Sequence, residues 1–249
     1  MTNIRTIQSL QNPLIKHLVK VRQNRDYRNE HQSLILEGIK PILEVAQHNQ
    51  IKRIVTIDLS LVPKEIEPEE ILVVDQAAVD KISGLQHSPG ILAEIAMPAP
   101  SSLSQIRFLL VVDHINDPGN LGALIRSALA FGWEGIFILD QSCDIFNDKC
   151  LRAARGATFR LPYALGSMKD LAKIVSANDL TVWVADIAGA SLAEIGPQTN
   201  IALVLSHESG GAASGNFTNM QKITIPMPGP MESLNVAIAG SILLYSLKQ

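Results

Sequence analysis

The polar residues best suited to chemistry lie in three stretches of the second half of the chain, 113–120 (DHINDPGN), 206–212 (SHESGGA) and 226–235 (PMPGPMESLN). Each follows a segment that reads as a strand. The carboxyl ends of parallel strands meet at one edge of a sheet, where ligands of such sheets bind. The density of Pro and Gly in 226–230 also keeps backbone groups out of regular pairing. The three loops therefore predict one binding pocket at that edge.

Several common chemistries lack their signatures in this sequence. Ser206, His207 and Glu208 are adjacent on an extended segment, so their side chains point to opposite sides and cannot form a nucleophile, base and orienter relay. The GxSxG, GxGxxG and GxxxxGK[ST] patterns do not occur. Cys143 and Cys150 have no His cluster beside them, so neither a zinc site nor a disulfide framework is supported. We expect no bound metal.

The stretch 120–132 (NLGALIRSALAFG) predicts an amphipathic helix that Gly132 ends. Asn120 stands where an N-cap belongs, and that structural role alone would explain it. Arg126 lies off the apolar stripe, where a solvated arginine is the ordinary explanation. Both residues therefore have a structural interpretation beside a functional one.

The elements that must position these residues fall into two groups, separated by the Pro- and Ser-rich linker 97–105. We expect one domain over 1–98 and a second over 105–249. In the first, a small α/β sandwich is predicted from strands at 33–38, 51–57, 71–75 and 90–96 and helices at 39–49 and 76–83. In the second, strands alternate with helices, which indicates an α/β domain with a mostly parallel sheet covered on both faces. Its predicted strands are 108–113, 135–140, 181–186, 201–206 and 222–226, and its predicted helices are 120–131, 147–157 and 168–177.

Composition is that of a soluble globular protein, with 249 residues, 47% hydrophobic and 18% charged. No apolar run reaches the roughly 18 residues of a membrane span, and the N-terminus lacks a signal-peptide core, so a cytoplasmic protein without a membrane partner is expected. The net charge is −3, but residues 1–53 hold nine basic against four acidic residues. That excess of +5 suits contact with phosphate, and a solvated helix face explains it equally well.

The segment 233–247 is apolar almost all round, so a helix there must be covered on more than one side. We expect part of that cover to come from a second subunit, which would make the protein a homodimer. Burial wholly within one chain is the alternative.

Taken together, these stretches resemble the SpoU/TrmH-type RNA ribose 2′-O-methyltransferases of the SPOUT class. The first motif of that family resembles NxGAxxRxAxxFG and is matched from Asn120 through Arg126 to Gly132. Its third motif resembles IPMxGxxxSLNVSxAxxIxLY, which 225–245 (IPMPGPMESLNVAIAGSILLY) follows almost residue for residue. The stretch 151–163 is similar to the RAxxGAxxRLP segment of the family, with Ala154 where Ser is usual.

The N-terminal part of the chain, with QNPLIKHLVKVR, LILEG and GILAE, is similar to the ribosomal-protein-L30e-like substrate-binding domain that many members carry. The resemblance therefore covers nearly the whole chain. It implies an L30e-like RNA substrate-binding domain followed by a SPOUT methyltransferase domain whose C-terminal helix closes a trefoil knot.

The second motif departs from the family. Members usually show GxEGxG after the strand, whereas SHESGG keeps Glu208 and Gly211 and has Ser206 and Ser209 for the first two glycines. Glycine often marks a close approach of backbone to a ligand. The change predicts either weaker cofactor binding or a loop shifted by one residue to use Gly210.

The resemblance implies S-adenosylmethionine as the cofactor, a homodimer, and an RNA substrate, ribosomal RNA in preference to transfer RNA. The reaction would be attack of a ribose 2′-hydroxyl on the sulfonium methyl group. Arg126 matches the residue assigned as the base, and it either takes the proton or holds a phosphate and polarises the hydroxyl. The implied catalytic residues are Arg126, Asn120, Glu208, Ser233 and Asn235, and the implied cofactor-binding residues are Ser206, Gly211, Ile225, Met227 and Leu234.

Two other functions stay open on the sequence. Ser206, Ser209 and Ala154 are compatible with a non-catalytic RNA-binding or ribosome-assembly protein that kept the fold and lost cofactor use. A SPOUT enzyme that methylates a base is the second. The pair Asn120 and Arg126 favours ribose transfer over base methylation.

Overall fold

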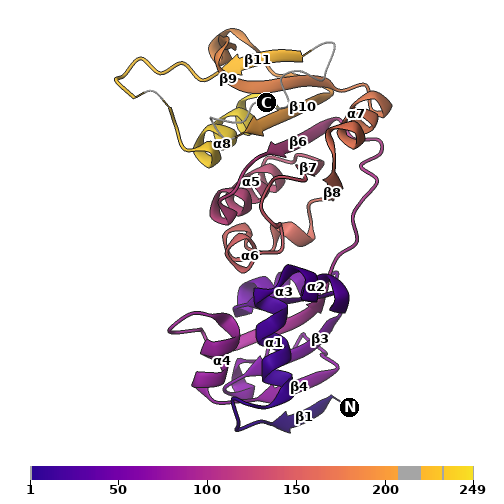
Figure 1. The fold of residues 1–249 in the computed structure, drawn as a ribbon, viewed down its shortest axis with the longest axis vertical. Coiled ribbons are helices and arrows are strands. Elements are labelled where there is room, and N and C mark those ends of the chain that lie inside the picture. The colour runs from indigo at the N-terminus through magenta and orange to yellow at the C-terminus, as the bar shows by residue number, and fades with distance from the viewer. Residues whose placement is uncertain (1, 207–219, 232, 249) are drawn as a thin grey trace. The chain divides into compact units, whose positions relative to one another are not determined.

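A computed structural model describes residues 2–206, 220–231 and 233–248 (Figure 1). The chain divides into two compact units, Met1–Pro98 with Phe146–Gly156, and Ala99–Ile145 with Ala157–Gln249. Each unit has a sheet of its own.

The N-terminal unit is built on a five-stranded mixed sheet of order β1-β4-β3-β5-β2. Strands β1, β4 and β3 run parallel, and β5 runs antiparallel to both β3 and β2. The predicted strands and helices of this region are confirmed, and the structure adds β1, α1 and α2, which periodicity did not identify. The strands are β1 (Asn3–Thr6), β2 (Ser33–Glu37), β3 (Ile51–Thr56), β4 (Glu70–Val73) and β5 (Ile91–Ala96), and the helices are α1 (Pro13–Gln23), α2 (Arg25–His31), α3 (Ile39–Ala46), α4 (Gln76–Ser83) and α6 (Asp148–Ala154).

Capping explains where α1 and α2 begin. The Asn12 side chain accepts a hydrogen bond from the backbone N–H of Leu14, and Pro13 occupies the first turn, where its missing N–H costs nothing. The Asn24 side chain accepts from Tyr27 N in the same way and starts α2 directly after α1 ends. Two adjacent helices therefore form, with Asn24 at the end of α1 and at the start of α2.

The C-terminal unit contains a six-stranded sheet of order β11-β9-β10-β6-β7-β8 in which every pairing is parallel. The predicted α/β class with a parallel sheet is confirmed. The strands are β6 (Phe108–Asp113), β7 (Gly135–Leu139), β8 (Tyr163–Gly166), β9 (Thr181–Ser191), β10 (Ile201–Ser206) and β11 (Met220–Thr224), the helices are α5 (Pro118–Ala130), α7 (Met168–Ala177) and α8 (Val236–Ser246), and short 3₁₀ turns occur at Leu59–Leu61, Ala157–Phe159 and Leu192–Glu194.

Helices cover both faces of this sheet. Successive strand residues point to opposite faces, and one face packs Val204 and Phe137 in a buried cluster with Leu171 of α7. The other face packs against α5 and α8. There α8 lies so close that a Cβ on Gly240 would stand 2.4 Å from Leu124 Cδ2 and 2.5 Å from Leu205 Cδ1. Glycine at this position therefore sets the distance between α8 and strand β10.

Helix α8 is only partly buried within the chain. Its residues Ala237, Gly240, Leu243 and Leu244 are buried, whereas Ile238, Ile242 and Tyr245 are 55%, 37% and 48% exposed. Complete burial within one chain, the alternative raised by the sequence, is therefore not found. The trefoil knot stays a prediction. Within the described ranges, no helix has both the length and the apolar character that crossing a membrane requires.

Candidate active site

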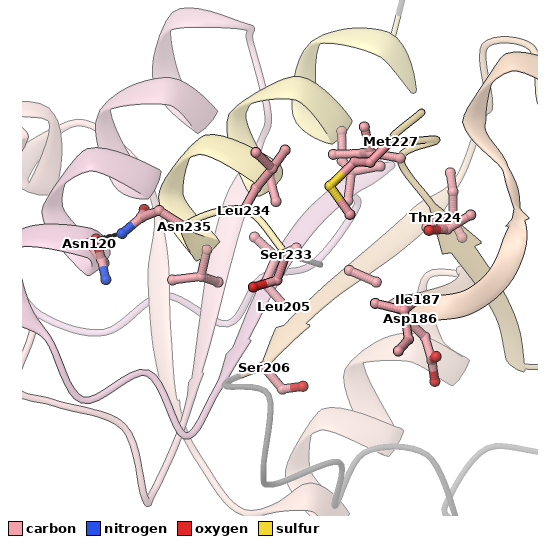
Figure 2. A pocket seen from close by; sticks show the side chains of 16 residues that line it. Asn120, Asp186, Ile187, Leu205, Ser206, Thr224, Met227, Ser233, Leu234 and Asn235 are labelled. Atoms are coloured by element: carbon pink, nitrogen blue, oxygen red, sulfur yellow. Dashed lines mark hydrogen bonds between the residues drawn. The ribbon is translucent and has the colours of Figure 1, made fainter. Parts of the chain in front are cut away.

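A pocket of about 380 Å³ opens at the carboxyl ends of β10, β9 and β11 (Figure 2). The N-terminal ends of α5 and α8 complete its wall. All three strands are parallel, so their carboxyl ends meet at one edge, as the sequence led us to expect. Seven of the residues implied as site residues line it, namely Asn120, Ser206, Ile225, Met227, Ser233, Leu234 and Asn235.

Two asparagines from opposite ends of the domain sequence meet at this pocket. Asn235 Nδ2 donates to Asn120 Oδ1 at 3.2 Å, and Asn235 Oδ1 accepts from Ala237 N at 2.9 Å, which caps α8. Figure 2 shows the two side chains pointing toward each other. The hydrogen bond joins the first and third sequence motifs and aligns the starts of α5 and α8.

The expectation that Asn120 caps α5 is wrong. The cap is Asp117, whose Oδ1 accepts from Asn120 N at 2.8 Å, and Pro118 follows it in the first turn. The helix therefore begins earlier than predicted. Asn120 lies inside the first turn, which leaves its side chain free to bond to Asn235.

Of the three other implied site residues, only Arg126 lies within the described part of the chain, and it does not line this pocket. Arg126 lies on α5 about 120° around the helix axis from Asn120. Its side chain is exposed and makes no hydrogen bond or ion pair with any other residue that the structure describes. Glu208 and Gly211, together with Ser209 and Gly210, lie outside the described residues. The roles of all ten stay predictions.

Asp186 is a pocket residue that the sequence reasoning missed. Its Oδ2 lies 2.6 Å from Lys222 Nζ, and its Oδ1 accepts from Ala188 N at 2.8 Å. The hydrogen bond from Lys222, followed by that from Ala188, lowers the carboxyl pKa, so the group is ionised at neutral pH. The signal was present in the sequence, because the predicted strand 181–186 (TVWVAD) ends on this aspartate, although β9 continues to Ser191 in the structure.

A second acidic group lies at the end of β6, the strand on the other side of β10 from β9. Asp113 ends β6 directly beside Ser206 of β10 and is 1% exposed. His114 has a left-handed backbone, with φ 54°, and its Nδ1 donates to Asp113 Oδ1 at 2.5 Å. That hydrogen bond is the main reason that the pKa of His114 is raised above its usual 6.5. The imidazole therefore holds its proton to higher pH than a free histidine does.

A family model described as the SpoU rRNA Methylase family matches residues 107–245, more than half of the chain. The chain belongs to this family. The prediction of an RNA methyltransferase that uses S-adenosylmethionine is thereby confirmed at the level of the family.

Members of the family and related structures resemble the chain over nearly its full length. The 23S rRNA (guanosine(2553)-2′-O)-methyltransferase of Bacillus subtilis strain 168 is 29% identical over 250 residues, covering 98% of this chain and 100% of that protein. The 23S rRNA (adenosine(1067)-2′-O)-methyltransferase of Streptomyces azureus is 24% identical over 260 residues, covering 98% and 96%. The AdoMet-bound rRNA methyltransferase of Sinorhizobium meliloti has a TM-score of 0.85 at 24% identity, covering 97% and 96%, which shows the shared fold.

The pocket of this SpoU family member fits S-adenosylmethionine in size and chemistry. Its volume lies within the range of roughly 300–1,000 Å³ that small-molecule pockets occupy. Leu205, Ile223 and Leu243 give it apolar walls for a purine, and the Asp186 carboxylate can accept hydrogen bonds from ribose hydroxyls or an amino group. Ser206, which replaces a family glycine, lines the pocket without closing it.

Proposed function

We propose that this chain transfers the methyl group of S-adenosylmethionine to a ribose 2′-hydroxyl of ribosomal RNA, with the pocket of Figure 2 as its cofactor site. The observation that carries the proposal is the meeting of Asn120 and Asn235 at a ligand-sized pocket in a member of the SpoU family. The relatives named as 23S rRNA 2′-O-methyltransferases support ribosomal RNA in preference to transfer RNA.

The pocket residues bind and orient the cofactor, which supplies an electrophilic methyl group when it is bound. Leu234, Ile225 and Met227 come from the Pro-rich turn and offer apolar contact together with backbone amides and carbonyls. The N-terminal end of α8 meets the same edge of the sheet. A helix leaves its first N–H groups without intrahelical acceptors, so such groups can bond to a ligand. Asp186 adds a carboxylate, the one among the lining residues that the structure describes, and is suited to hydroxyls.

Arg126 acts on the RNA. Its exposed guanidinium has no protein partner among the described residues, so it is free to bind an incoming phosphodiester with two parallel hydrogen bonds. A guanidinium stays protonated near neutral pH, so we assign it the polarising role over that of a free base. Glu208, Ser233 and Asn235 orient the ribose and the motif loops in this proposal.

The chain works as a homodimer in this proposal. Ile238, Ile242 and Tyr245 recur at i, i+4 and i+7 and form an exposed apolar stripe along α8, and the Phe131 ring packs 5.4 Å from that of Tyr245. A second copy of the chain covers such a stripe by presenting the same helix. Light scattering at micromolar concentration tests this: we expect a dimer, and a monomer would contradict it.

Each part of the chain has its own task in the proposal. Residues 1–98 bind the RNA substrate, residues 105–249 carry the methyltransferase domain, and 97–105 links them. The basic excess of 1–53 supplies phosphate contacts that position the RNA. Ribosomal RNA as substrate places the protein in the cytoplasm.

Nucleoside mass spectrometry tests the reaction. Purified protein, S-adenosylmethionine with a labelled methyl group and a 23S rRNA transcript are incubated, and the RNA is digested to nucleosides. We expect the label in a 2′-O-methylnucleoside. Label in a base-methylated nucleoside, or no label with transcript and with intact ribosomal RNA alike, would contradict the proposal.

A further inference from the structure

One face of the sheet in the N-terminal unit is apolar along one part of its strands and charged along the next. Leu72, Val55 and Leu92 lie side by side on β4, β3 and β5 and belong to the buried apolar cluster beneath α1. Two residues further along the same strands, and hence on the same face, the row is Glu70, Arg53 and Glu94. Such a row of charges within the strands is unusual, because this face of the sheet is otherwise core.

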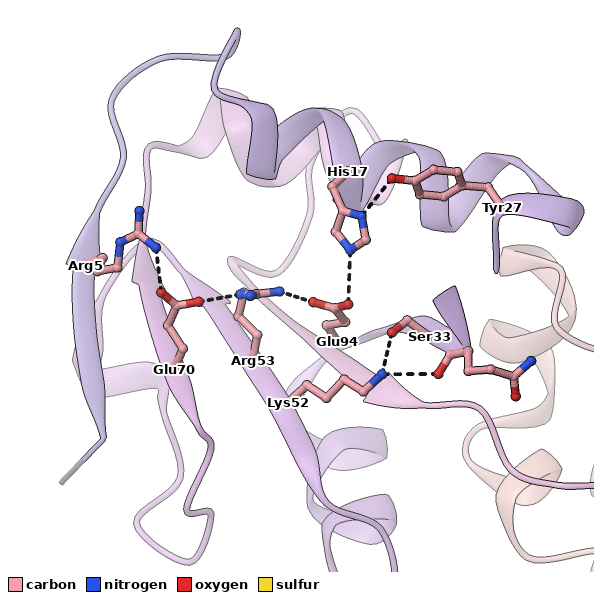
Figure 3. A network of polar contacts seen from close by, with 9 residues as sticks. Arg5, His17, Tyr27, Ser33, Lys52, Arg53, Glu70 and Glu94 are labelled. Atoms are coloured by element: carbon pink, nitrogen blue, oxygen red, sulfur yellow. Dashed lines mark hydrogen bonds and ion pairs between the residues drawn. The ribbon is translucent and has the colours of Figure 1, made fainter. Parts of the chain in front are cut away.

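The charged row continues into helix α1 as one chain of contacts (Figure 3). Arg53 bridges the two carboxylates, with Nε 2.7 Å from Glu70 Oε2 and Nη1 in contact with Glu94 Oε2. Glu94, which is 4% exposed, also contacts His17 Nε2 through Oε1 at 3.3 Å, and His17 Nδ1 lies 3.0 Å from Tyr27 Oη. These bonds fix both nitrogens of His17 and the hydroxyl of Tyr27.

Above this row lies a recess of about 700 Å³, which we name the α1/α2 recess. It is lined by residues that include His17, His31, Lys52, Arg53 and Glu94, all within the N-terminal unit. The side chains of the charged row are held by contacts with one another and leave the recess open. The residues that fill the recess floor are therefore positioned before any ligand arrives.

Three rings stand at the rim of the α1/α2 recess. The ring centroids of Tyr27 and His31 are 4.1 Å apart, and those of His17 and His31 are 5.0 Å apart. His31 is exposed and has no hydrogen-bond partner among the described residues, whereas its two neighbours are fixed. An exposed ring backed by fixed rings is a platform on which a flat group can stack.

Two lysines lie near these rings, and Lys52 lines the same recess as His31. Lys20 Nζ lies 5.4 Å from the centre of the Tyr27 ring, and Lys52 Nζ donates to Gln32 O and Ser33 Oγ, next to His31 in the sequence. Lys16 precedes Lys20 by one turn of α1 and is exposed. Proteins that bind single-stranded RNA stack an unpaired base on an aromatic ring and hold the neighbouring phosphates with nearby cations.

We propose that the α1/α2 recess binds an unpaired nucleotide of the RNA substrate, with its base stacked on His31 and its flanking phosphates held by Lys20 and Lys52. This inference rests on the proposed function, because it assigns the recess to the RNA that the other unit methylates. It gives the basic excess of residues 1–53 a defined location.

Fluorescence anisotropy of the full chain with a labelled twelve-nucleotide oligoadenylate tests the recess. Loss of one stacked base costs on the order of tenfold or more in affinity. We expect His31→Ala to weaken binding of the single strand by about tenfold and His31→Phe to retain it. His48→Ala, which changes an exposed histidine in the turn after α3, should have no effect. Lys20→Ala and Lys52→Ala should lower the dependence of affinity on salt, and Lys64→Ala should not.

Wild-type affinity in His31→Ala, or equal losses in His31→Ala and His31→Phe, would overturn the stacking role. An effect of His31→Ala on methylation of assembled ribosomal particles but not of protein-free transcript would point to a protein partner and would also overturn it. Titration of each variant with S-adenosylmethionine separates the two proposals. Intact cofactor binding with lost RNA binding locates the defect in the recess, whereas absent cofactor binding in the wild type concerns the proposed function alone.

Discussion

The candidate cofactor pocket and the α1/α2 recess are built on different principles. The pocket of the C-terminal unit is lined mainly by apolar side chains and takes its polar atoms from loops and helix starts at the edge of an all-parallel sheet. The α1/α2 recess takes its polar atoms from the middle of strands, such as Arg53 on β3 and Glu94 on β5.

The difference follows from how each sheet is covered. A parallel sheet with helices on both faces has no exposed face, so only its edge can bind a ligand. The sheet of the N-terminal unit is mixed, and charged side chains on part of one face border an open recess. In the parallel sheet the binding residues lie in loops, where they form recognisable sequence motifs. In the mixed sheet they lie within the strands themselves.

The largest expected effect concerns the edge of the parallel sheet. Arg126→Ala should lower the rate of methyl transfer by about a hundredfold or more, because a group that assists proton loss contributes on that scale. Calorimetric affinity for S-adenosylmethionine should not change, since Arg126 does not line the pocket. Arg107→Ala, which changes an exposed arginine of the same unit outside the family motifs, is the control. Retained turnover would remove Arg126 from the mechanism.

The charged row should matter for stability instead. Glu94→Ala removes a buried carboxylate from Arg53 and His17 and should lower the free energy of unfolding by about 2–3 kcal/mol. Glu69→Ala, which removes an exposed carboxylate near the recess, should cost far less. Chemical denaturation measures both. Equal free energies of unfolding for the two variants would mean that the charged row contributes little and that solvent screens its contacts.

Gly240→Ala tests the packing that positions the cofactor pocket. The added methyl group meets Leu124 and Leu205, both fully or almost fully buried, so overpacking should outweigh the gain in helix propensity and cost about 1 kcal/mol. Gly196→Ala has open space around its Cβ and should be neutral. Thermal unfolding compares the two variants, and a stabilised Gly240→Ala protein would contradict the close approach of α8.

The smallest effect is a pH dependence at the end of β6. The pKa of His114 is raised above 6.5 by Asp113, so the ion pair stabilises the fold fully below about pH 6.5, and that contribution is lost as pH rises through the folded-state value. His114→Asn keeps a residue that tolerates positive φ. The loss of thermal stability in this variant should be larger at pH 6 than at pH 9. The same loss at both values would show that the pair does not titrate as described.

Much of the fold and part of the site could be predicted from the sequence. The strands that end in 113, 206 and 224 were readable because buried parallel strands are continuous apolar runs, and the loops after them because Pro, Gly and Asn interrupt those runs. Asn120 was assigned the wrong structural role, since Asp117 and Pro118 offered a second cap three residues earlier. The proline in the first turn is the local signal that favours the earlier start.

The recess could not be predicted in the same way. Glu94 and Arg53 sit inside strands and read as ordinary outward-facing polar residues until the pairing places them on the face of Val55 and Leu92. Their proximity to His17 depends on the path of α1, a helix that periodicity did not identify. The shared face of these residues and their proximity to His17 both depend on long-range strand pairing and packing, which cannot be read from a single sequence.

Calorimetric titration of the purified protein with S-adenosylmethionine tests the central claim most directly. Binding at micromolar affinity, with one site or fewer per subunit, is expected, and Asp186→Asn should weaken it by about tenfold through loss of a charged hydrogen-bond acceptor. The absence of heat from binding, with and without RNA, would contradict the assignment of the pocket at the ends of β9, β10 and β11 as the cofactor site.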